Sequence, residues 1–454
     1  MIGSVRGFRA VGTVLVAAAT IATLAGLTGP AGAAPTTTSG PAGPSGPTAV
    51  AQPKQTAVAQ ATKTAIHVAP TSLNLGHRRV GTFLYAQASV ITNTGTLPLA
   101  LNAIKFVKGT PQDFTVGTDC FPNRRPVTLA PGKSCLISAI FTPRDYGPRT
   151  ATLSISSSAK PSPQLLKLSG FGTVGYFITG IQGGVATFGD AQFKGQMKGS
   201  SINDPIIAIN PTGTGAGYWL TGTDGGVFAF GNAAFFGSTG SMRLSRPVVG
   251  MATLRNNKGY WLVGSDGGVF SFGGAKFLGS TGGMHLNQPI VGMVATRSGK
   301  GYWLVARDGG IFTFGDAKFY GSTGSLHLTS PIVGMARTQS GTGYWLVAAD
   351  GGVFTFGNAR FFGSAAGHGF GAFVGIAPMP NALGYWLSND VGQVFAFGAP
   401  YFGDAFRRGI RDARGLAGTA PLLGPKHVSG VINLPTFHLN SKLEEAARQR
   451  VSLP

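Results

Sequence analysis

The chain has few of the residues that build long helices and carboxylate clusters. Only 11% of its 454 residues are charged, and its two glutamates, Glu444 and Glu445, both lie near the C-terminus. Because Glu and Lys are strong helix formers, this scarcity argues against long amphipathic helices. The 72 glycines, 28 prolines and 31 phenylalanines are instead typical of turns and short apolar strands. We therefore expect an all-β fold.

Cysteine is almost absent. Cys120 and Cys135 are the only two, and they are 15 positions apart. In an exported protein such a pair predicts a disulfide bond, with two free thiols or half of a metal site as the alternatives. A structural zinc site needs four ligands, and the sequence has no second cysteine pair or clustered histidines. We therefore expect no metal.

Long apolar runs are absent beyond the N-terminus. The run Ala10–Leu27 follows two arginines and precedes the small residues Ala31–Ala33, which predicts a signal peptide over residues 1–33. An uncleaved membrane anchor is the alternative, since 18 apolar residues approach spanning length. Residues 34–65 are rich in Pro, Thr and Ala, which predicts a disordered linker.

Acidic residues are scarce relative to basic ones, and the formal net charge is +21. For an exported protein this excess favours anionic envelope polymers as partners, with solubility and nonspecific adhesion as the alternative explanation of the charge. No block of Lys and Arg marks a nucleic-acid site.

Recognisable catalytic and cofactor motifs are also missing. The chain has no G-x-S-x-G elbow. Pro131–Ser134 resembles the end of a phosphate loop, but Val127 occupies the place of the required glycine. We therefore expect no cofactor and no catalytic residues.

Residues 66–173 read as a β-sandwich. The stretches Ser134–Phe141 and Ala151–Ser157 alternate apolar and polar residues with the period of half-buried strands. The turn TNTG, the strand end Phe141–Pro143 and the closing Leu168–Gly170 resemble immunoglobulin-like domains of the ASH/Hydin type. That resemblance implies a spacer or docking module.

Residues 174–424 repeat one unit six times. Its tyrosines are 42, 42, 42, 42 and 41 residues apart, at positions Tyr176, Tyr218, Tyr260, Tyr302, Tyr344 and Tyr385. Each unit holds four apolar runs, which predicts four-stranded blades of a six-bladed β-propeller; a β-solenoid is the alternative. The runs YWLV and PIVGM are continuously apolar, so we expect both to be covered on two faces. The last unit has an extra strand, Gly415–Thr419, which can close the ring.

The consensus sequence of the units, GYW-x-V-x-x-DGG-V-F-x-F-G, also resembles repeats of exported actinobacterial proteins over residues 175–420. That family implies no function for this chain. Residues 425–454 are expected to form a C-terminal tail.

Two repeated sets have structural explanations. In Asp-Gly-Gly the carboxylate bonds to the local backbone and glycine takes positive φ, so we assign Asp224, Asp266, Asp308 and Asp350 to hairpin turns. Tryptophans within apolar strands form a core between blades more readily than a sugar-binding surface. Both interpretations remain open for Trp219, Trp261, Trp303, Trp345 and Trp386.

Connector residues are the remaining binding candidates. Arg243, His285 and His327 occupy the same place in three successive units, inside Gly- and Ser-rich loops. We expect them to be exposed and to form a weak, repeated binding site.

We accordingly expect an exported, non-enzymatic and monomeric protein of the cell surface or medium. Its propeller loops would bind a carbohydrate, an envelope polymer or a protein. The alternative is a secreted hydrolase or lyase with its active site at the propeller mouth, which would need unique polar residues converging on the axis.

Overall fold

The computed structural model describes residues 63–82, 86–121, 127–419 and 430–433. The expected signal peptide and nearly all of the linker lie outside these residues, as does most of the expected tail. Within them the fold is all-β; the short 3₁₀ helices are η1 (Pro111–Asp113) and η3 (Ala405–Arg408).

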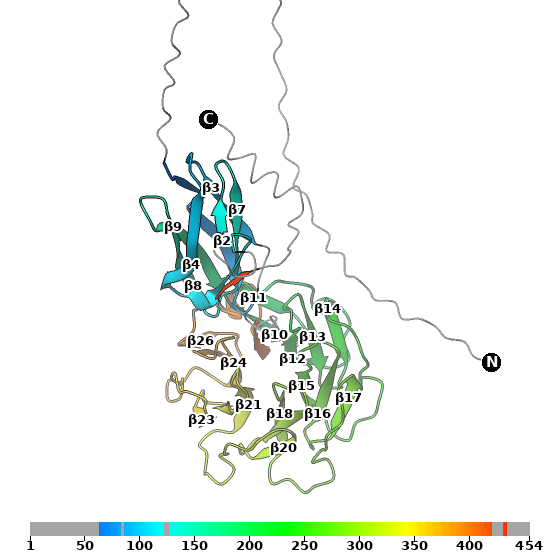
Figure 1. Cartoon of the computed structure of the whole chain (residues 1–454). Coiled ribbons are helices and arrows are strands. Elements are labelled where there is room, and N and C mark those ends of the chain that lie inside the picture. Colours follow the sequence, from blue (N-terminus) through cyan, green and yellow to red (C-terminus); the bar gives the residue numbers. More distant parts are fainter. Residues whose placement is uncertain (1–62, 83–85, 122–126, 420–429, 434–454) are drawn as a thin grey trace, which may run out of the picture. The chain divides into compact units, whose positions relative to one another are not determined.

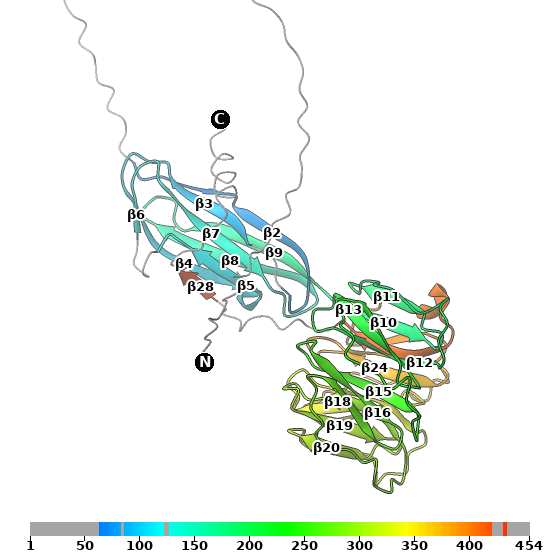
Figure 2. The same ribbon diagram turned by 90° about the vertical axis from the view of Figure 1, so that its right-hand side faces the viewer.

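The first part of the described chain is an immunoglobulin-like sandwich of two sheets (Figure 2). One sheet has the order β1–β3–β7–β5–β28 and the other β2–β9–β8–β4–β6. The strands are β1 (Ile66–Ala69), β2 (Ser72–Arg79), β3 (Gln87–Asn93), β4 (Leu99–Gly109), β5 (Phe114–Thr118), β6 (Val127–Leu129), β7 (Ser134–Phe141), β8 (Gly147–Ser157), β9 (Gln164–Thr173) and β28 (Gly430–Asn433).

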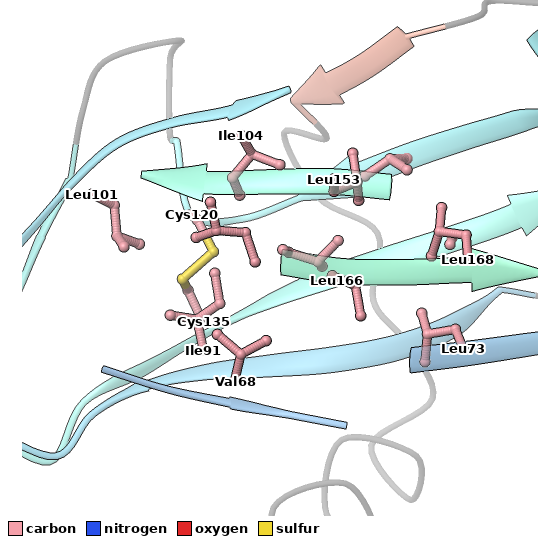
Figure 3. Packing of buried hydrophobic residues seen from close by; sticks show 14 of the residues in the cluster. Val68, Leu73, Ile91, Leu101, Ile104, Cys120, Cys135, Leu153, Leu166 and Leu168 are labelled. Atoms are coloured by element: carbon pink, nitrogen blue, oxygen red, sulfur yellow. A yellow bond between two sulfur atoms is a disulfide. The ribbon is translucent and has the colours of Figure 1, made fainter. Parts of the chain in front are cut away.

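The two sheets bury one apolar core, in which side chains such as Ile91, Leu153 and Leu166 are fully enclosed (Figure 3). Cys120 and Cys135 form the predicted disulfide inside this core, with their Cα atoms 5.2 Å apart. The alternation noted in β7 and β8 provides these inward-facing residues, since every second side chain of a strand points to the same face.

A segment from the expected C-terminal tail adds a strand to the sandwich. β28 pairs in parallel with β5, with Val431 opposite Val116. Strand β5 thereby gains a second neighbour beside β7.

The repeats fold into six antiparallel three-stranded sheets, here called the ring. Their inner, middle and outer strands are β27, β10 and β11; β12, β13 and β14; β15, β16 and β17; β18, β19 and β20; β21, β22 and β23; and β24, β25 and β26. In chain order the bounds are β10 Gly175–Gly180, β11 Val185–Gly189, β12 Ile206–Pro211, β13 Gly217–Gly222, β14 Val227–Gly231, β15 Val248–Thr253, β16 Gly259–Gly264, β17 Val269–Gly273, β18 Ile290–Ala295, β19 Gly301–Ala306, β20 Ile311–Gly315, β21 Ile332–Arg337, β22 Gly343–Ala348, β23 Val353–Gly357, β24 Phe373–Pro378, β25 Tyr385–Asn389, β26 Val394–Phe397 and β27 Ala413–Gly418.

The inner strands contact one another in a closed circle. β12, β15, β18, β21, β24 and β27 each contact the next, and β27 also contacts β12 (Figure 1). β27, the extra strand of the last unit, pairs with β10 of the first. These contacts close the ring, as a propeller requires, and the propeller itself stays a prediction.

Aromatic side chains repeat the same circle between the sheets. The tryptophan of each middle strand packs on the tyrosine of the next sheet, and in the first sheet Phe177 takes the place of tryptophan. Ring centroids are 5.4 Å apart for Phe177–Tyr218, 5.9 Å for Trp219–Tyr260, 5.5 Å for Trp261–Tyr302, 5.9 Å for Trp303–Tyr344, 5.9 Å for Trp345–Tyr385 and 5.2 Å for Trp386–Tyr176.

Two expectations about the strands need correction. Each sheet has three strands rather than four, because the segment that carries the aromatic-Gly pair crosses to the next sheet as an irregular connector. The middle strand β19 is buried along its whole length, as expected, but the inner strand β18 is only partly buried. Residues of the inner strands line a central cavity, so these strands stay partly accessible although both of their faces pack on neighbouring sheets.

Candidate functional site

The Asp-Gly-Gly turns lie at one end of the ring, here called the turn end. Each Asp Oδ1 accepts a hydrogen bond from the amide two residues later, at 2.7 Å for Gly226, 2.9 Å for Gly268 and 2.8 Å for Gly310 and Gly352. The glycine between them has positive φ, +79° at Gly309. The carboxylates thus hold their own turns together, which is the structural role assigned to Asp224, Asp266, Asp308 and Asp350.

No metal centre is evident in the described residues. The one group there with metal-ligand spacing consists of Asp119, Cys120 and Cys135. Both cysteines belong to the disulfide, so their sulfur atoms are not thiolate ligands.

The tryptophans are inaccessible to a ligand. All five are at most 1% exposed. Each indole Nε1 donates to a backbone carbonyl; Trp303, for example, donates to Lys318 O at 2.8 Å. The structure therefore places the five candidate tryptophans in the core between the sheets, where they contact protein atoms and not a ligand: Trp219, Trp261, Trp303, Trp345 and Trp386.

Arg243, His285 and His327 are exposed at the turn end. Their loops are anchored there, because the Thr239 amide donates to Gly225 O and the Thr323 amide donates to Gly309 O. His285 also lines a groove of about 700 Å³ together with Asp266 and Arg307. The three residues belong to successive sheets, so the structure repeats them around the ring and does not bring them into one cluster.

Six other aromatic side chains form a repeated exposed set, here called the aromatic rim. Each lies a few residues after the end of the outer strand of its sheet. Each is between 53% and 59% exposed: Phe193, Phe235, Phe277, Phe319, Phe361 and Tyr401. They lie toward the end of the ring opposite the Asp turns, which we call the hairpin end because the links from inner to middle strands are there.

The sequence carries a signal for this rim. Two residues before the glycine of each connector, the side chain is aromatic in all six units. The following side chain varies, as Lys194, Leu278 and Tyr320 show. The partly buried second residue is tied to the core through its backbone: the Leu278 amide donates a hydrogen bond to Tyr302 Oη at 3.1 Å. An aromatic side chain that is present in every repeat but exposed, outside the hydrophobic cores, is a candidate for binding a ligand.

The cavity at the centre of the ring has a volume of about 340 Å³. Its lining is mainly apolar, with Met251, Met293 and Met335 among the residues, and it also includes polar residues such as Asn210 and Gln339. Among the described residues that line it there is no Asp, Glu, His or Cys. Its charged groups are Arg255 and Arg337, at the hairpin end.

Within the described residues, no helix combines the length and the apolar character needed to cross a membrane.

These observations define the class of the protein: an all-β chain with an immunoglobulin-like sandwich and a ring of six small sheets. Residues 38–171 match the family model described as HYDIN/CFA65/VesB-like, Ig-like domain. The resemblance of residues 66–173 is thereby confirmed at the level of an immunoglobulin-like domain. The resemblance of the repeats to exported actinobacterial proteins has no counterpart in the comparisons and stays a prediction.

Three solved structures have a likeness to this chain. The Vibrio cholerae VesB protease is 20% identical with a TM-score of 0.20, over 24% of this chain and 32% of that one. The Cps50 (Swd1) beta-propeller domain of Myceliophteria thermophila is 8% identical with a TM-score of 0.31, over 43% and 65%. The ASH/PapD-like domain of human CEP192 is 12% identical with a TM-score of 0.20, over 28% and 94%. The chain thus spans about a third of VesB, and at these scores the likenesses carry no functional argument.

No curated protein sequence matches the chain. The immunoglobulin-like domain and the disulfide are compatible with an extracellular location.

Proposed function

We propose that this is an exported, non-enzymatic binding protein whose aromatic rim binds the sugar units of an envelope polysaccharide. The observation that carries the proposal is the rim itself: one exposed aromatic side chain in the equivalent place of each of six sheets. A flat aromatic face is an apolar surface against which a sugar ring packs. Six equivalent faces suit a ligand that is itself repetitive.

Charge beside the rim supports an acidic polymer. The residue before the aromatic is an exposed base in three successive sheets: Lys276, Lys318 and Arg360. A base next to an aromatic face allows one subsite to bind both a sugar ring and an acidic substituent. Weak subsites of this kind gain strength together, because binding at one raises the local concentration of polymer at the next.

The composition of the central cavity favours binding over catalysis. A hydrolase or lyase at this position would need a general acid or base in reach of its substrate. The described residues that line the cavity offer none of the usual carboxylate, imidazole or thiol groups.

The test is a triple variant of the rim, Phe235→Ser, Phe277→Ser and Phe319→Ser. At about 1 kcal/mol for each lost aromatic contact, retention on an insoluble acidic wall polysaccharide should fall about 100-fold. The matched control is Met242→Ser, Met284→Ser and Leu326→Ser, three side chains of similar exposure at the turn end of the same sheets.

Retention is measured at low salt and again at about 1 M salt, where the Debye length falls to about 3 Å. We expect the rim variant to lose retention at both salt concentrations and the control to keep it. Equal losses in the two variants, or retention that disappears completely in high salt, would contradict binding by the rim. Release of reducing ends from the bound polymer would contradict the non-enzymatic role.

A further inference from the structure

A second site, independent of the aromatic rim, lies where the central cavity meets the hairpin end of the ring. Three arginines from successive sheets gather there. Arg255 follows inner strand β15, Arg297 follows β18, and Arg337 ends β21. Arg255 and Arg337 line the cavity. Arg297 is exposed, and its Nη1 donates to the backbone oxygen of Gln339, which also lines the cavity.

These guanidinium groups have no acidic partner in the described part of the chain. Neither of the two ion pairs found there includes any of them. Arg337 Nη1 donates to Thr338 O at 3.0 Å, and Arg297 Nη1 donates to Gln339 O at 3.4 Å. The nearby carboxylate of Asp316 instead accepts hydrogen bonds from Thr296 and Ser298.

The cluster interrupts the repeat. At the place of Arg255 and Arg297 the other units have Gly213, Gln339, Pro380 and Ala420. At the place of Arg337 they have Pro211, Thr253, Ala295, Pro378 and Gly418. The other sheets of the ring have the same architecture without a basic residue at these positions. The architecture therefore does not explain the arginines.

Without a bound anion, the three neighbouring arginines destabilise the folded chain. Burial, together with repulsion from Arg255 and Arg297, lowers the pKa of Arg337 to about 10. Burial and Arg297 likewise lower the pKa of Arg255. Arg255 and Arg337 are partly buried and Arg297 is exposed beside them. Like charges so placed raise the free energy of the folded chain, and a bound anion would relieve that repulsion.

We propose that Arg255, Arg297 and Arg337 bind the phosphate group of a small molecule whose apolar part enters the central cavity. The planar guanidinium matches phosphate oxygens with paired donors, and three such groups suit a dianion better than a single carboxylate. The walls behind the arginines are mainly methionine and aliphatic side chains. A volume of about 340 Å³ is at the lower end of the range for small-molecule sites, so an aromatic ring or a short acyl chain fits.

The probes are inorganic phosphate and phenyl phosphate, each titrated into the full chain by calorimetry at constant ionic strength, with chloride as the reference anion. Phenyl phosphate should bind about tenfold more tightly than inorganic phosphate, because its ring leaves water for an apolar cavity. Arg255→Gln and Arg337→Gln should each weaken both probes at least about tenfold. The control is Arg243→Gln, an exposed arginine at the turn end, which should change either affinity less than about twofold.

A fourth variant separates the phosphate site from the apolar site. Ala295→Phe places a ring in the cavity, so phenyl phosphate should fall to the affinity of inorganic phosphate while inorganic phosphate binds as before. Melting temperatures without ligand show that each variant is folded. If Arg337→Gln does not fold, Arg255→Gln still provides the test, since within the described residues the Arg255 side chain makes no hydrogen bond that the change would remove.

Three results would overturn the proposal: heats no larger than those of chloride, Arg243→Gln weakening phosphate as much as Arg255→Gln, or equal affinities for the two probes in the unaltered chain. Loss of polysaccharide retention in the rim variant with phosphate binding intact would show that the two sites are independent.

Discussion

At the scale of single residues, the tyrosine of each repeat joins neighbouring parts of the ring. Tyr302 Oη accepts the Leu278 amide and donates to Gly279 O at 2.6 Å, so it ties the preceding connector to the core. The same pair of bonds occurs at Tyr260 and Tyr344. Burial is the largest cause that raises the pKa of these phenols above its ordinary value of 10.

These tyrosines predict loss of stability in alkali. Because the folded pKa is raised, the folded chain keeps protons that the unfolded chain releases above about pH 10. The stabilisation is therefore complete below that pH and decreases as the pH rises toward the folded value. Absorbance of phenolate at 295 nm and circular dichroism of the strands should change together. Gradual phenolate formation with unchanged strand dichroism would contradict this coupling.

At the scale of elements, the Asp-Gly-Gly hairpin explains why repeated carboxylates need no metal. Asp308 bonds within its own turn, and a Cβ on Gly309 would stand 1.8 Å from Thr323 Oγ1. Thr323 in turn donates to Asp308 O at 3.0 Å, so the turn also anchors the connector to the next sheet.

Substitution in this turn tests the structural role. Asp308→Ala removes one turn bond and should lower the free energy of unfolding by about 1 kcal/mol, measured by urea denaturation. Asp308→Asn is the matched control, since its amide oxygen accepts the same bond, and it should be close to neutral. If Asn destabilised as much as Ala, the negative charge itself would be important and the turn explanation would fail.

At the scale of the whole molecule, closure of the ring depends on a segment more than 230 residues from its partner. β27 pairs with β10, and Trp386 packs on Tyr176 across the same junction. Without β27 the first sheet would present an unpaired edge and the central cavity would open.

Truncation tests closure. A chain that ends at Gly409 lacks β27, and we expect it to lose its cooperative thermal transition and to bind the dye ANS, because apolar strands become exposed. The shorter chain also lacks β28, so the matched control is a chain that ends at Thr419: it keeps β27 and every strand of the ring, and its ring should still melt cooperatively. A sharp transition at the same temperature in the shorter chain would show that closure is not required.

Much of this fold follows from the sequence. The 42-residue period, the runs around Tyr302 and Trp303 and the Asp308 turn predicted where strands and hairpins lie, because burial and turn chemistry are local properties of the pattern. The disulfide followed from there being only two cysteines. The prediction of a fourth strand in each repeat was wrong, because a connector that crosses between sheets is as apolar as a strand.

Two features were decided only by the tertiary structure. Whether Phe319 or Tyr320 faces water depends on where the next sheet packs, which no window around those residues contains. Arg255, Arg297 and Arg337 are 42 and 40 positions apart in the chain and meet because neighbouring sheets converge on one axis. By itself the sequence determined the repeated unit and its buried side chains, whereas closure of the ring decided which side chains remain exposed and which distant charges share one site.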